Sequence, residues 1–270
     1  MSDRLNTLFS RCKAESRSAL VGYLTAGDPD VETSEKLLLS LAGQVDILEI
    51  GMPFSDPMAD GPVIQAASER ALASGASIRD VFAVAAKVRA AHPDICIVLM
   101  GYANVPYTIG FDSFSRQAAE AGVDGVLIVD IPAEEGSVCD ESFKKYGLHR
   151  ILLLSPTSSD ERIKLASQAA SGFIYYVSLT GITGAEMGEV SSIANQVAKI
   201  RGFSDLPVCV GFGVKTAEQA SSVARFADGV VIGSHFVSQI AGHLDAPEKM
   251  IASLSSEAAA MRAAVAGKAA

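Results

Sequence analysis

Two carboxylates that lie close together in the sequence could move protons during a reaction. Glu49 interrupts the apolar segment 46–51, and Asp60 lies in the Pro- and Gly-rich segment 51–62. A carboxylate that is partly removed from water has a raised pKa, which suits proton transfer near neutral pH. From these residues alone, Glu49 could equally be a structural group paired with an Arg or a backbone amide. Asp60 could equally be an ordinary turn residue.

The position of Glu49 within its segment indicates which way its side chain points. Side chains alternate along a strand, so Glu49 shares a side with Ile47 and lies opposite Leu48 and Ile50. In a barrel, one side faces the helices and the other faces the interior. A carboxylate against the helix layer would be costly, so we expect Glu49 to face the interior near the mouth.

Short apolar runs rich in β-branched residues recur about every 25 to 30 residues and alternate with helical patterns. This rhythm is typical of βα units in a parallel sheet, in which functional groups gather at the carboxyl ends of the strands. The predicted strands are Ala19–Leu24, Asp46–Ile50, Cys96–Met100, Gly125–Val129, Ile151–Leu154, Phe173–Val177, Val208–Val210 and Gly229–Ile232.

Eight strands with alternating helices favour an α/β fold with a single (β/α)8 TIM barrel over residues 1–270, although an open doubly wound sheet would give similar local patterns. Residues 1–18 contain a short helix, Arg4–Ala14, that we expect to cap the bottom of the barrel. The barrel itself spans 19–240, and 241–270 form a C-terminal helix and tail. Asp112 and Thr216 are predicted helix N-caps.

Composition excludes several classes of protein. The 270 residues carry a formal charge of −9 with no Lys- or Arg-rich stretch, which argues against general nucleic-acid binding. No 18-residue apolar run and no signal-peptide pattern occurs, so we expect a cytoplasmic protein. The four cysteines are far apart and include no CxxC pair, which favours reduced thiols, with Cys96 and Cys209 as inert core residues.

The segment from Glu49 to Pro62 is similar to the signature of the tryptophan synthase α-subunit family. The match is long, and further matches follow each of the other seven predicted strands, so the resemblance covers essentially the whole chain. These matches are residues 24–29, 102–104, 130–132, 155–157, 181–184, 211–213 and 233–234.

The resemblance implies a lyase of L-tryptophan biosynthesis that cleaves indole-3-glycerol phosphate by a retro-aldol reaction. The products are indole and glyceraldehyde 3-phosphate. In this interpretation Glu49 is the acid and base at the carbon and the hydroxyl, while Asp60 contacts the indole nitrogen. No metal and no organic cofactor is expected in this chain.

The same resemblance implies further binding residues. Segment 179–190 contains three glycines and is expected to act as a lid, in which Thr183 helps to position Asp60. Leu179 departs from the pattern, because some members have Arg there, and Tyr23 and Gly101 are milder variations. The implied substrate-binding residues are Tyr23, Met100, Leu127, Tyr175, Thr183, Phe212 and Ile232, and the implied phosphate-binding residues are Gly184, Gly213, Gly233 and Ser234.

The family resemblance also implies a partner. We expect an α2β2 heterotetramer in which a pyridoxal-phosphate β subunit receives indole. Exposed Pro and Phe side chains in the loop after the second strand would suit this surface, although a plain rigid loop is an equal interpretation from the residues. The implied interface residues are Pro53, Asp56, Asn104, Asp130 and Pro132.

Other functions remain as alternatives. A Schiff-base aldolase needs a buried Lys at a strand end, and only Lys215 falls near one. A metal-dependent aldolase needs clustered His, but His92, His149, His235 and His243 are scattered. A binding or regulatory barrel without catalysis would have no chemical need for both Glu49 and Asp60.

Overall fold

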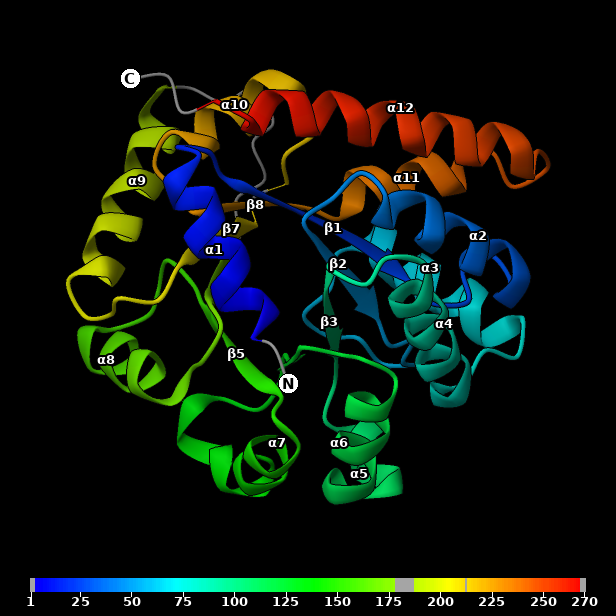
Figure 1. Ribbon diagram of the computed structural model, residues 1–270, viewed down its shortest axis with the longest axis horizontal. Coiled ribbons are helices and arrows are strands. Elements are labelled where there is room, and N and C mark those ends of the chain that lie inside the picture. Colours follow the sequence, from blue (N-terminus) through cyan, green and yellow to red (C-terminus); the bar gives the residue numbers. More distant parts are fainter. Residues whose placement is uncertain (1–2, 178–186, 212, 268–270) are drawn as a thin grey trace.

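The computed structural model describes residues 3–177, 187–211 and 213–267, apart from the side chains of 187–189. In this part of the chain, parallel strands pair in sequence order and β1 also pairs with β8, so the sheet closes into a barrel surrounded by helices (Figure 1). The predicted (β/α)8 fold is confirmed. The strands are β1 (Ala19–Thr25), β2 (Ile47–Gly51), β3 (Cys96–Gly101), β4 (Gly125–Ile128), β5 (His149–Leu154), β6 (Ile174–Val177), β7 (Val208–Gly211) and β8 (Gly229–Ile232).

The strands agree with the predicted segments to within one or two residues at each end. Every residue of β1, β2, β4, β7 and β8 is buried. This burial on both sides explains why the sequence of each strand is almost continuously apolar, since one side packs inside the barrel and the other packs against helices. A polar side chain on such a strand therefore needs a specific reason.

The helices follow local signals in the sequence. Thr216 is the N-cap of α10, as predicted, and forms a capping box with Gln219. Asp112 was predicted to be an N-cap, but the helix begins at Phe111, and Asp112 instead pairs with Lys145 at 2.6 Å. The helices are α1 (Arg4–Ala14), α2 (Val31–Ala42), α3 (Pro62–Ala73), α4 (Ile78–Ala91), α5 (Asn104–Ile109), α6 (Phe111–Glu120), η1 (Ala133–Val138), α7 (Asp140–Tyr146), α8 (Asp160–Ala169), α9 (Met187–Arg201), α10 (Ala217–Ala224), α11 (Ser234–Ala241) and α12 (Pro247–Val265).

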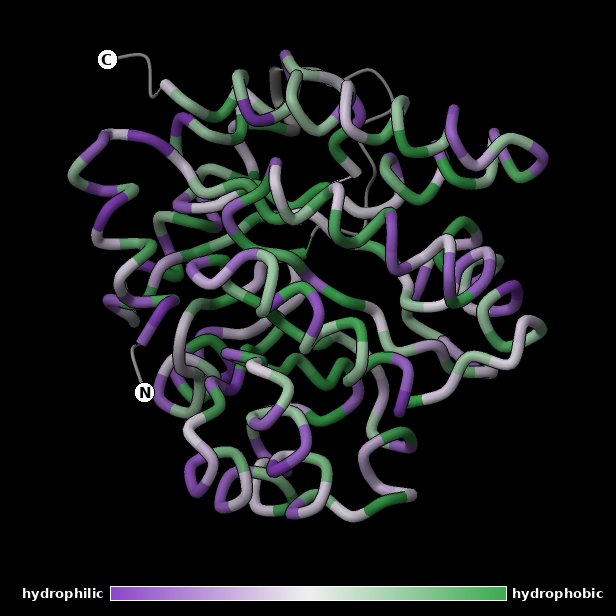
Figure 2. Tube along the Cα trace, turned by 45° about the vertical axis from the view of Figure 1, so that its right-hand side comes forward, coloured by the Kyte–Doolittle hydropathy of each residue, from purple (hydrophilic) through white to green (hydrophobic). Residues whose placement is uncertain are grey.

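The apolar side chains form two clusters. The larger cluster lies between the barrel and its helices, and the smaller one fills the barrel interior. Figure 2 shows the strands as mainly hydrophobic and the outer helices as mixed. Helix α1 contributes Leu5, Leu8, Phe9 and Cys12 to the interior cluster, and Phe9 contacts Phe173 with ring centroids 5.9 Å apart. The expected role of this helix, to close the bottom of the barrel, is confirmed.

The four cysteines are free and buried. Cys96 and Cys209 lie in the interior cluster, where burial raises the pKa of both thiols. A thiol in such a place is poorly reactive, because the thiolate is the nucleophile. Within the described residues, no helix has the length and apolar character needed to cross a membrane.

Candidate active site

Glu49 lies in the middle of β2, inside the barrel. Only 1% of its surface is exposed, and both carboxylate oxygens lack a hydrogen-bond partner among the described residues. Desolvation, with a smaller contribution from the charge of Asp60, raises the pKa of Glu49 to about 8. The carboxyl group is therefore largely protonated at neutral pH and can deliver a proton.

The alternation of β2 accounts for this placement. Ile47 belongs to the interior cluster, whereas Leu48 and Ile50 belong to the layer between the barrel and the helices. Glu49 has the parity of Ile47 and is paired in register with Tyr23 of β1 and Val98 of β3. The predicted inward orientation of Glu49 is confirmed.

Asp60 lies at the end of the loop between β2 and α3 and is half-buried. Its carboxylate accepts a hydrogen bond from the Tyr102 hydroxyl, which lowers its pKa, but desolvation is larger and raises the pKa to about 6. The backbone of Asp60 is also held: its N–H donates to the Pro57 carbonyl at 3.0 Å, and its carbonyl accepts from Gln65 Nε2 at 2.8 Å. Asp60 is thus fixed in place and mainly ionised at pH 7.

Tyr102 is a residue of the site to which the sequence analysis gave no role. Its hydroxyl accepts a hydrogen bond from the Ala59 N–H at 3.0 Å and also bonds the Asp60 carboxylate. Its ring stacks on Phe54 with centroids 5.5 Å apart, and its side chain is 2% exposed. Tyr102 therefore ties the end of β3 to the loop that carries Asp60. Its place directly after β3 was the available signal, since such positions face the mouth of a barrel.

Several predicted substrate-binding residues lie together near the mouth. Leu127 and Tyr175 belong to the interior cluster, and Met100 packs against it. Tyr23 contacts the larger cluster, but it has the strand parity of Val21, which is in the interior cluster, and its hydroxyl lies against Gly51 on the side of Glu49. Burial raises the pKa values of Tyr23 and Tyr175, both of which lie near enough to Glu49 for its charge to raise them further, and all four side chains can offer apolar contact to a flat ring. Thr183, Phe212 and Gly184 of the predicted site, and Leu179 with them, lie outside the described residues.

Ile232 is not brought together with these side chains. It belongs to the layer between barrel and helices, and it is paired with Gly22, at which a Cβ atom would lie 2.8 Å from Val45 in that layer. Val231, one residue earlier, belongs to the interior cluster. The assignment of Ile232 to the pocket is therefore corrected to Val231, and the period-two alternation of β8 was the signal for it.

Two of the predicted phosphate-binding residues, Gly233 and Ser234, lie at the start of one helix. Gly233 is the N-cap of α11 and Ser234 its first residue, while Gly213 follows β7 with φ 62°. The Gly233 carbonyl accepts from the Val237 N–H at 3.1 Å, so the N–H groups of the first turn have no partner within the helix. Such N–H groups can bind the oxygens of a phosphate.

The predicted interface residues lie in loops at the same end of the barrel. Asp130 accepts a hydrogen bond from the Ala103 N–H at 2.8 Å, next to Asn104 at the start of α5, and the Pro132 carbonyl accepts from Arg150 at 2.9 Å. Asp56 is exposed.

The expected exposure of Pro and Phe in the loop after β2 is wrong. Pro53 is buried, and Phe54 is half-buried because it packs on Tyr102. Met58 and Tyr107 carry the large exposed apolar surface near this rim instead, at 80% and 72% exposure.

The groups that alternative chemistries would need lie elsewhere. Lys215 is exposed rather than buried at a strand end. His149 pairs with Asp3 and His235 with Glu257, and no group of three His, Cys, Asp or Glu in the described part of the chain could hold a metal ion. The buried Lys of a Schiff-base aldolase is therefore not found at Lys215.

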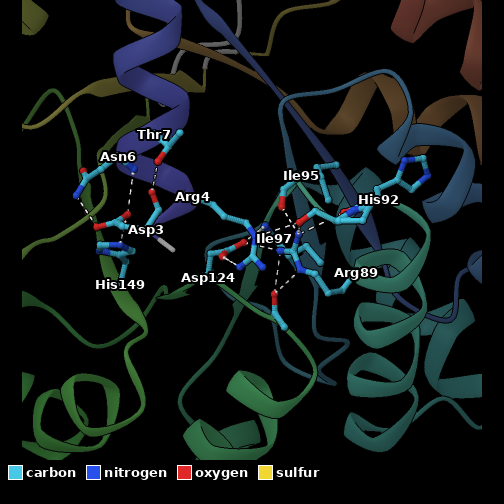
Figure 3. Close-up of polar contacts among 12 residues, drawn as sticks. Asp3, Arg4, Asn6, Thr7, Arg89, His92, Ile95, Ile97, Asp124 and His149 are labelled. Atoms are coloured by element: carbon cyan, nitrogen blue, oxygen red, sulfur yellow. Dashed lines mark hydrogen bonds and ion pairs between the residues drawn. The ribbon is translucent and has the colours of Figure 1, made fainter. Parts of the chain in front are cut away.

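A cavity of about 1060 Å³ lies at the opposite end of the barrel, near the amino ends of β4 and β5. Arg4, Arg89 and Asp124 line it, and their charges are used in ion pairs with one another (Figure 3). It contains no unpaired buried carboxylate comparable with Glu49. The mouth, rather than this cavity, has the groups that a reaction needs.

A closed parallel barrel with two such carboxylates and a glycine–serine helix start at the carboxyl ends of its strands defines a (β/α)8-barrel enzyme. Residues 9–266 match the family model of the tryptophan synthase alpha chain. The chain belongs to this family, and it is a lyase of tryptophan biosynthesis.

Individual relatives agree with the family match. The tryptophan synthase alpha chain of Zymomonas mobilis is 48% identical over 88% of this chain and 87% of its own length. That of Alkalilimnicola ehrlichii is 46% identical over 98% and 97%. The crystal structure of tryptophan synthase subunit alpha from Legionella pneumophila has a TM-score of 0.91 at 38% identity and covers 98% of this chain and 99% of its own.

Proposed function

We propose that this chain cleaves indole-3-glycerol phosphate to indole and glyceraldehyde 3-phosphate, with Glu49 moving the protons and Asp60 holding charge. The observation that carries the proposal is Glu49: a buried carboxyl group without a hydrogen-bond partner among the described residues, with a pKa raised to about 8, on the interior side of β2. A structural Glu would have a partner. An acid and base that must both give and take a proton near neutral pH fits this environment.

The reaction can be written with balanced protons. The protonated Glu49 carboxyl group delivers its proton to indole C3, which leaves a positive charge on the ring nitrogen. The ionised Asp60 stabilises that charge. The Glu49 carboxylate then takes the proton of the glyceryl hydroxyl while the bond between C3 and the glyceryl carbon breaks. The electrons of the broken bond return to the indole ring. The products are indole and the aldehyde, and Glu49 is protonated again.

The remaining residues bind the substrate. Tyr23, Met100, Leu127, Tyr175 and Val231 enclose the indole ring, and the family resemblance adds Thr183 and Phe212 to the residues that contact the substrate. The phosphate accepts hydrogen bonds from the N–H groups around Gly233 and Ser234, and the family resemblance adds Gly213 and Gly184 to the residues that bind it. The free first turn of α11 supports this arrangement.

The proposal includes a partner, a β subunit that holds pyridoxal phosphate and receives indole in an α2β2 assembly. In this proposal the partner contacts the rim formed by Pro53, Asp56, Asn104, Asp130 and Pro132, of which Asp56, Asn104 and Asp130 are exposed and Pro53 is buried. The exposed apolar side chains of Met58 and Tyr107 at the same rim support a protein contact there, because large exposed apolar groups gather at interfaces.

The proposal treats residues 1–270 as one domain. Residues 1–18 close the bottom, 19–240 form the barrel and 241–270 form the C-terminal helix and tail. Hydrogen bonds support the attachment of the last helix: Ser255 bonds Ser40 at 2.7 Å, and Arg262 donates to the Gln44 carbonyl at 3.0 Å.

Indole release from indole-3-glycerol phosphate by the purified chain tests the activity. Glu49→Gln keeps the shape of the side chain but cannot cycle a proton, so we expect kcat to fall by about a thousandfold. Glu120→Gln, an exposed change on α6, is the matched control and should act like the wild type. Near wild-type activity of Glu49→Gln would overturn the catalytic assignment. A wild-type chain that releases no indole would favour a non-catalytic barrel.

The partner is tested separately, by adding a tryptophan synthase β subunit to the same assay. We expect the two chains to elute together in size-exclusion chromatography and the rate of indole release to change. No co-elution and an unchanged rate would count against the partner while leaving the activity intact.

A further inference from the structure

Two buried hydroxyl groups lie together at the mouth and have no role in the mechanism above. The Tyr23 hydroxyl and Thr25 Oγ1 are 3.1 Å apart, and the two side chains are 5% and 1% exposed. Both residues are on the interior side of β1, at its carboxyl end. A purely apolar slot for a ring would need neither hydroxyl.

The Tyr23 hydroxyl lies just above Glu49. The two residues are register partners on neighbouring strands. Gly51, two residues further along β2 on the same side as Glu49, provides the space: a Cβ atom there would lie 2.2 Å from the Tyr23 hydroxyl oxygen. The phenol therefore occupies the place that a side chain at position 51 would fill. A substrate that reaches Glu49 from the mouth must pass beside this hydroxyl.

The other end of the Tyr23 side chain lies next to the phosphate-binding helix start. A Cβ atom at Gly233 would lie 3.6 Å from Tyr23 Cβ, in ordinary contact. The side chain of Tyr23 thus extends from the N-cap of α11 to the space above Glu49. In indole-3-glycerol phosphate, the glyceryl chain spans the same interval, since it joins the phosphate to the carbon at which the bond breaks.

We propose that Tyr23 is a specificity-determining residue whose hydroxyl donates a hydrogen bond to a glyceryl hydroxyl oxygen of the substrate beside Glu49, with Thr25 orienting it. This inference rests on the proposed function and adds a polar contact to a residue so far assigned only to the apolar lining. Tyr23 can accept from the Thr25 hydroxyl while its own proton points to the substrate. Burial raises the pKa of Tyr23, so the group stays a neutral donor at working pH.

The contact has a selective consequence. A buried donor that loses its acceptor is costly, so a site built around a donor rejects a ligand without the matching oxygen. The chain should therefore distinguish indole-3-glycerol phosphate from an indole-3-propyl phosphate of equal length that has no hydroxyl groups. The apolar ring contacts and the phosphate contacts are the same for both ligands.

The experiment compares these two ligands in the full-length chain. Tyr23→Phe removes one oxygen and keeps the ring, and we expect it to raise KM or lower kcat so that kcat/KM for indole-3-glycerol phosphate falls about tenfold. The inhibition constant of indole-3-propyl phosphate should stay the same or fall, because the substitution removes the donor that this ligand leaves unpaired. Thr25→Val, which leaves the phenol without its orienting partner, should give a smaller loss of about threefold.

Tyr176→Phe is the matched control. Tyr176 is the neighbour of Tyr175 and is equally buried, but it belongs to the layer between barrel and helices. Its substitution should leave the kinetic constants for both ligands within twofold of the wild type. Thermal unfolding of each variant checks that the chain is folded.

Two outcomes would overturn the inference. If Tyr23→Phe leaves kcat/KM for indole-3-glycerol phosphate unchanged, the hydroxyl does not contact the substrate. If both ligands are weakened equally, Tyr23 acts through packing alone. Failure of the proposed function is a different result, because it would show as a wild-type chain that releases no indole.

Discussion

Buried carboxylates occur at both ends of the barrel, and those at the amino ends of the strands are hydrogen-bonded whereas Glu49 near the carboxyl ends is not. Three Asp residues directly precede a strand, of which Asp46 and Asp124 are buried and Asp228 is half-buried, and each accepts a backbone N–H from the preceding strand in the barrel. Each also pairs with an Arg. The contacts are Asp46 with Leu20 and Arg17, Asp124 with Ile97 and Arg89, and Asp228 with Val208 and Arg201.

Asp124 shows this arrangement most fully. Its two oxygens pair with Arg4 of α1 at 2.9 Å and Arg89 of α4 at 2.7 Å, and it accepts the Ile97 N–H at 2.8 Å (Figure 3). One carboxylate therefore joins the helix that closes the barrel, an outer helix and a strand. Its negative charge is compensated on every side, so its burial is compatible with a stable fold.

Carboxylates at the two ends of the barrel therefore have different roles, one in stability and one in catalysis. A carboxylate at the bottom has its hydrogen bonds satisfied and holds neighbouring strands together. Glu49 is buried without such partners, and its protonated form is favoured as a result. The protein loses stability at this position and gains a proton that can be transferred near neutral pH.

The largest expected effect is a loss of stability when Asp124, at the bottom of the barrel, is replaced. Asp124→Ala leaves Arg4 and Arg89 without their shared partner and Ile97 without an acceptor, so the free energy of unfolding should fall by about 4 kcal/mol in urea titrations. The activity of the folded fraction should stay within twofold of the wild type. Glu120→Ala breaks an exposed pair with Arg116 and should cost less than about 0.5 kcal/mol. If both variants lost the same free energy of unfolding, the partners of Asp124 would not stabilise the barrel more than an exposed ion pair does.

The next largest expected effect is a gain in stability, from a substitution of Glu49 at the mouth of the barrel. The pKa of Glu49 is raised from 4.5 to about 8 on folding, so the folded state binds the proton more tightly and wild-type stability falls as pH rises between these values. Glu49→Gln removes this loss. The variant should be more stable than the wild type by on the order of 4 kcal/mol at pH 8.

The pH dependence is the control for that gain. Near pH 4.5 the wild-type group is protonated in the folded state and only half ionised in the unfolded state, so the stabilisation by Glu49→Gln should nearly vanish there. Urea titrations at several pH values measure the difference. A gain of equal size at pH 4.5 and pH 8 would show that the Glu49 proton is not its cause.

The smallest effect is a shift of a pH profile. Asp60 must be ionised and Glu49 protonated, so kcat/KM should be highest between about pH 6 and 8, with limbs that belong to the coupled pair. Tyr102→Phe removes the hydrogen bond that lowers the Asp60 pKa. The acidic limb should move up by about half a pH unit.

A second Tyr–Asp pair provides the control for that variant. The Tyr146 hydroxyl donates to Asp112 at 3.1 Å on the outside of the molecule. Tyr146→Phe should leave both limbs where they are in the wild type. If Tyr102→Phe also leaves the acidic limb unmoved, Tyr102 does not tune Asp60.

Much of the site could be predicted from local patterns together with the family resemblance. The alternation of β2 and the cost of burying a carboxylate against the helices predicted that Glu49 turns inward, and the spacing of apolar runs predicted eight βα units, whose closure into a barrel the structure decided. The family resemblance assigned Ile232 to the pocket without regard to the direction of its side chain. Ile232 faces the helices, and its neighbour Val231 faces the interior. Pro53 was assigned to the partner surface by the family resemblance, but the fold buries it.

The sequence by itself indicated where the strands lie along the chain, at which ends of them polar groups lie and on which side of its strand Glu49 lies, because these follow from periodicities of a few residues. Only the tertiary structure decided which carboxylates have partners. Tyr102 reaches the loop of Asp60 from 42 residues away, and the Asp124 pairs join residues 35 and 120 apart. Whether a buried charge is compensated depends on such distant contacts, and this decides which carboxylate stabilises the barrel and which one is free to react.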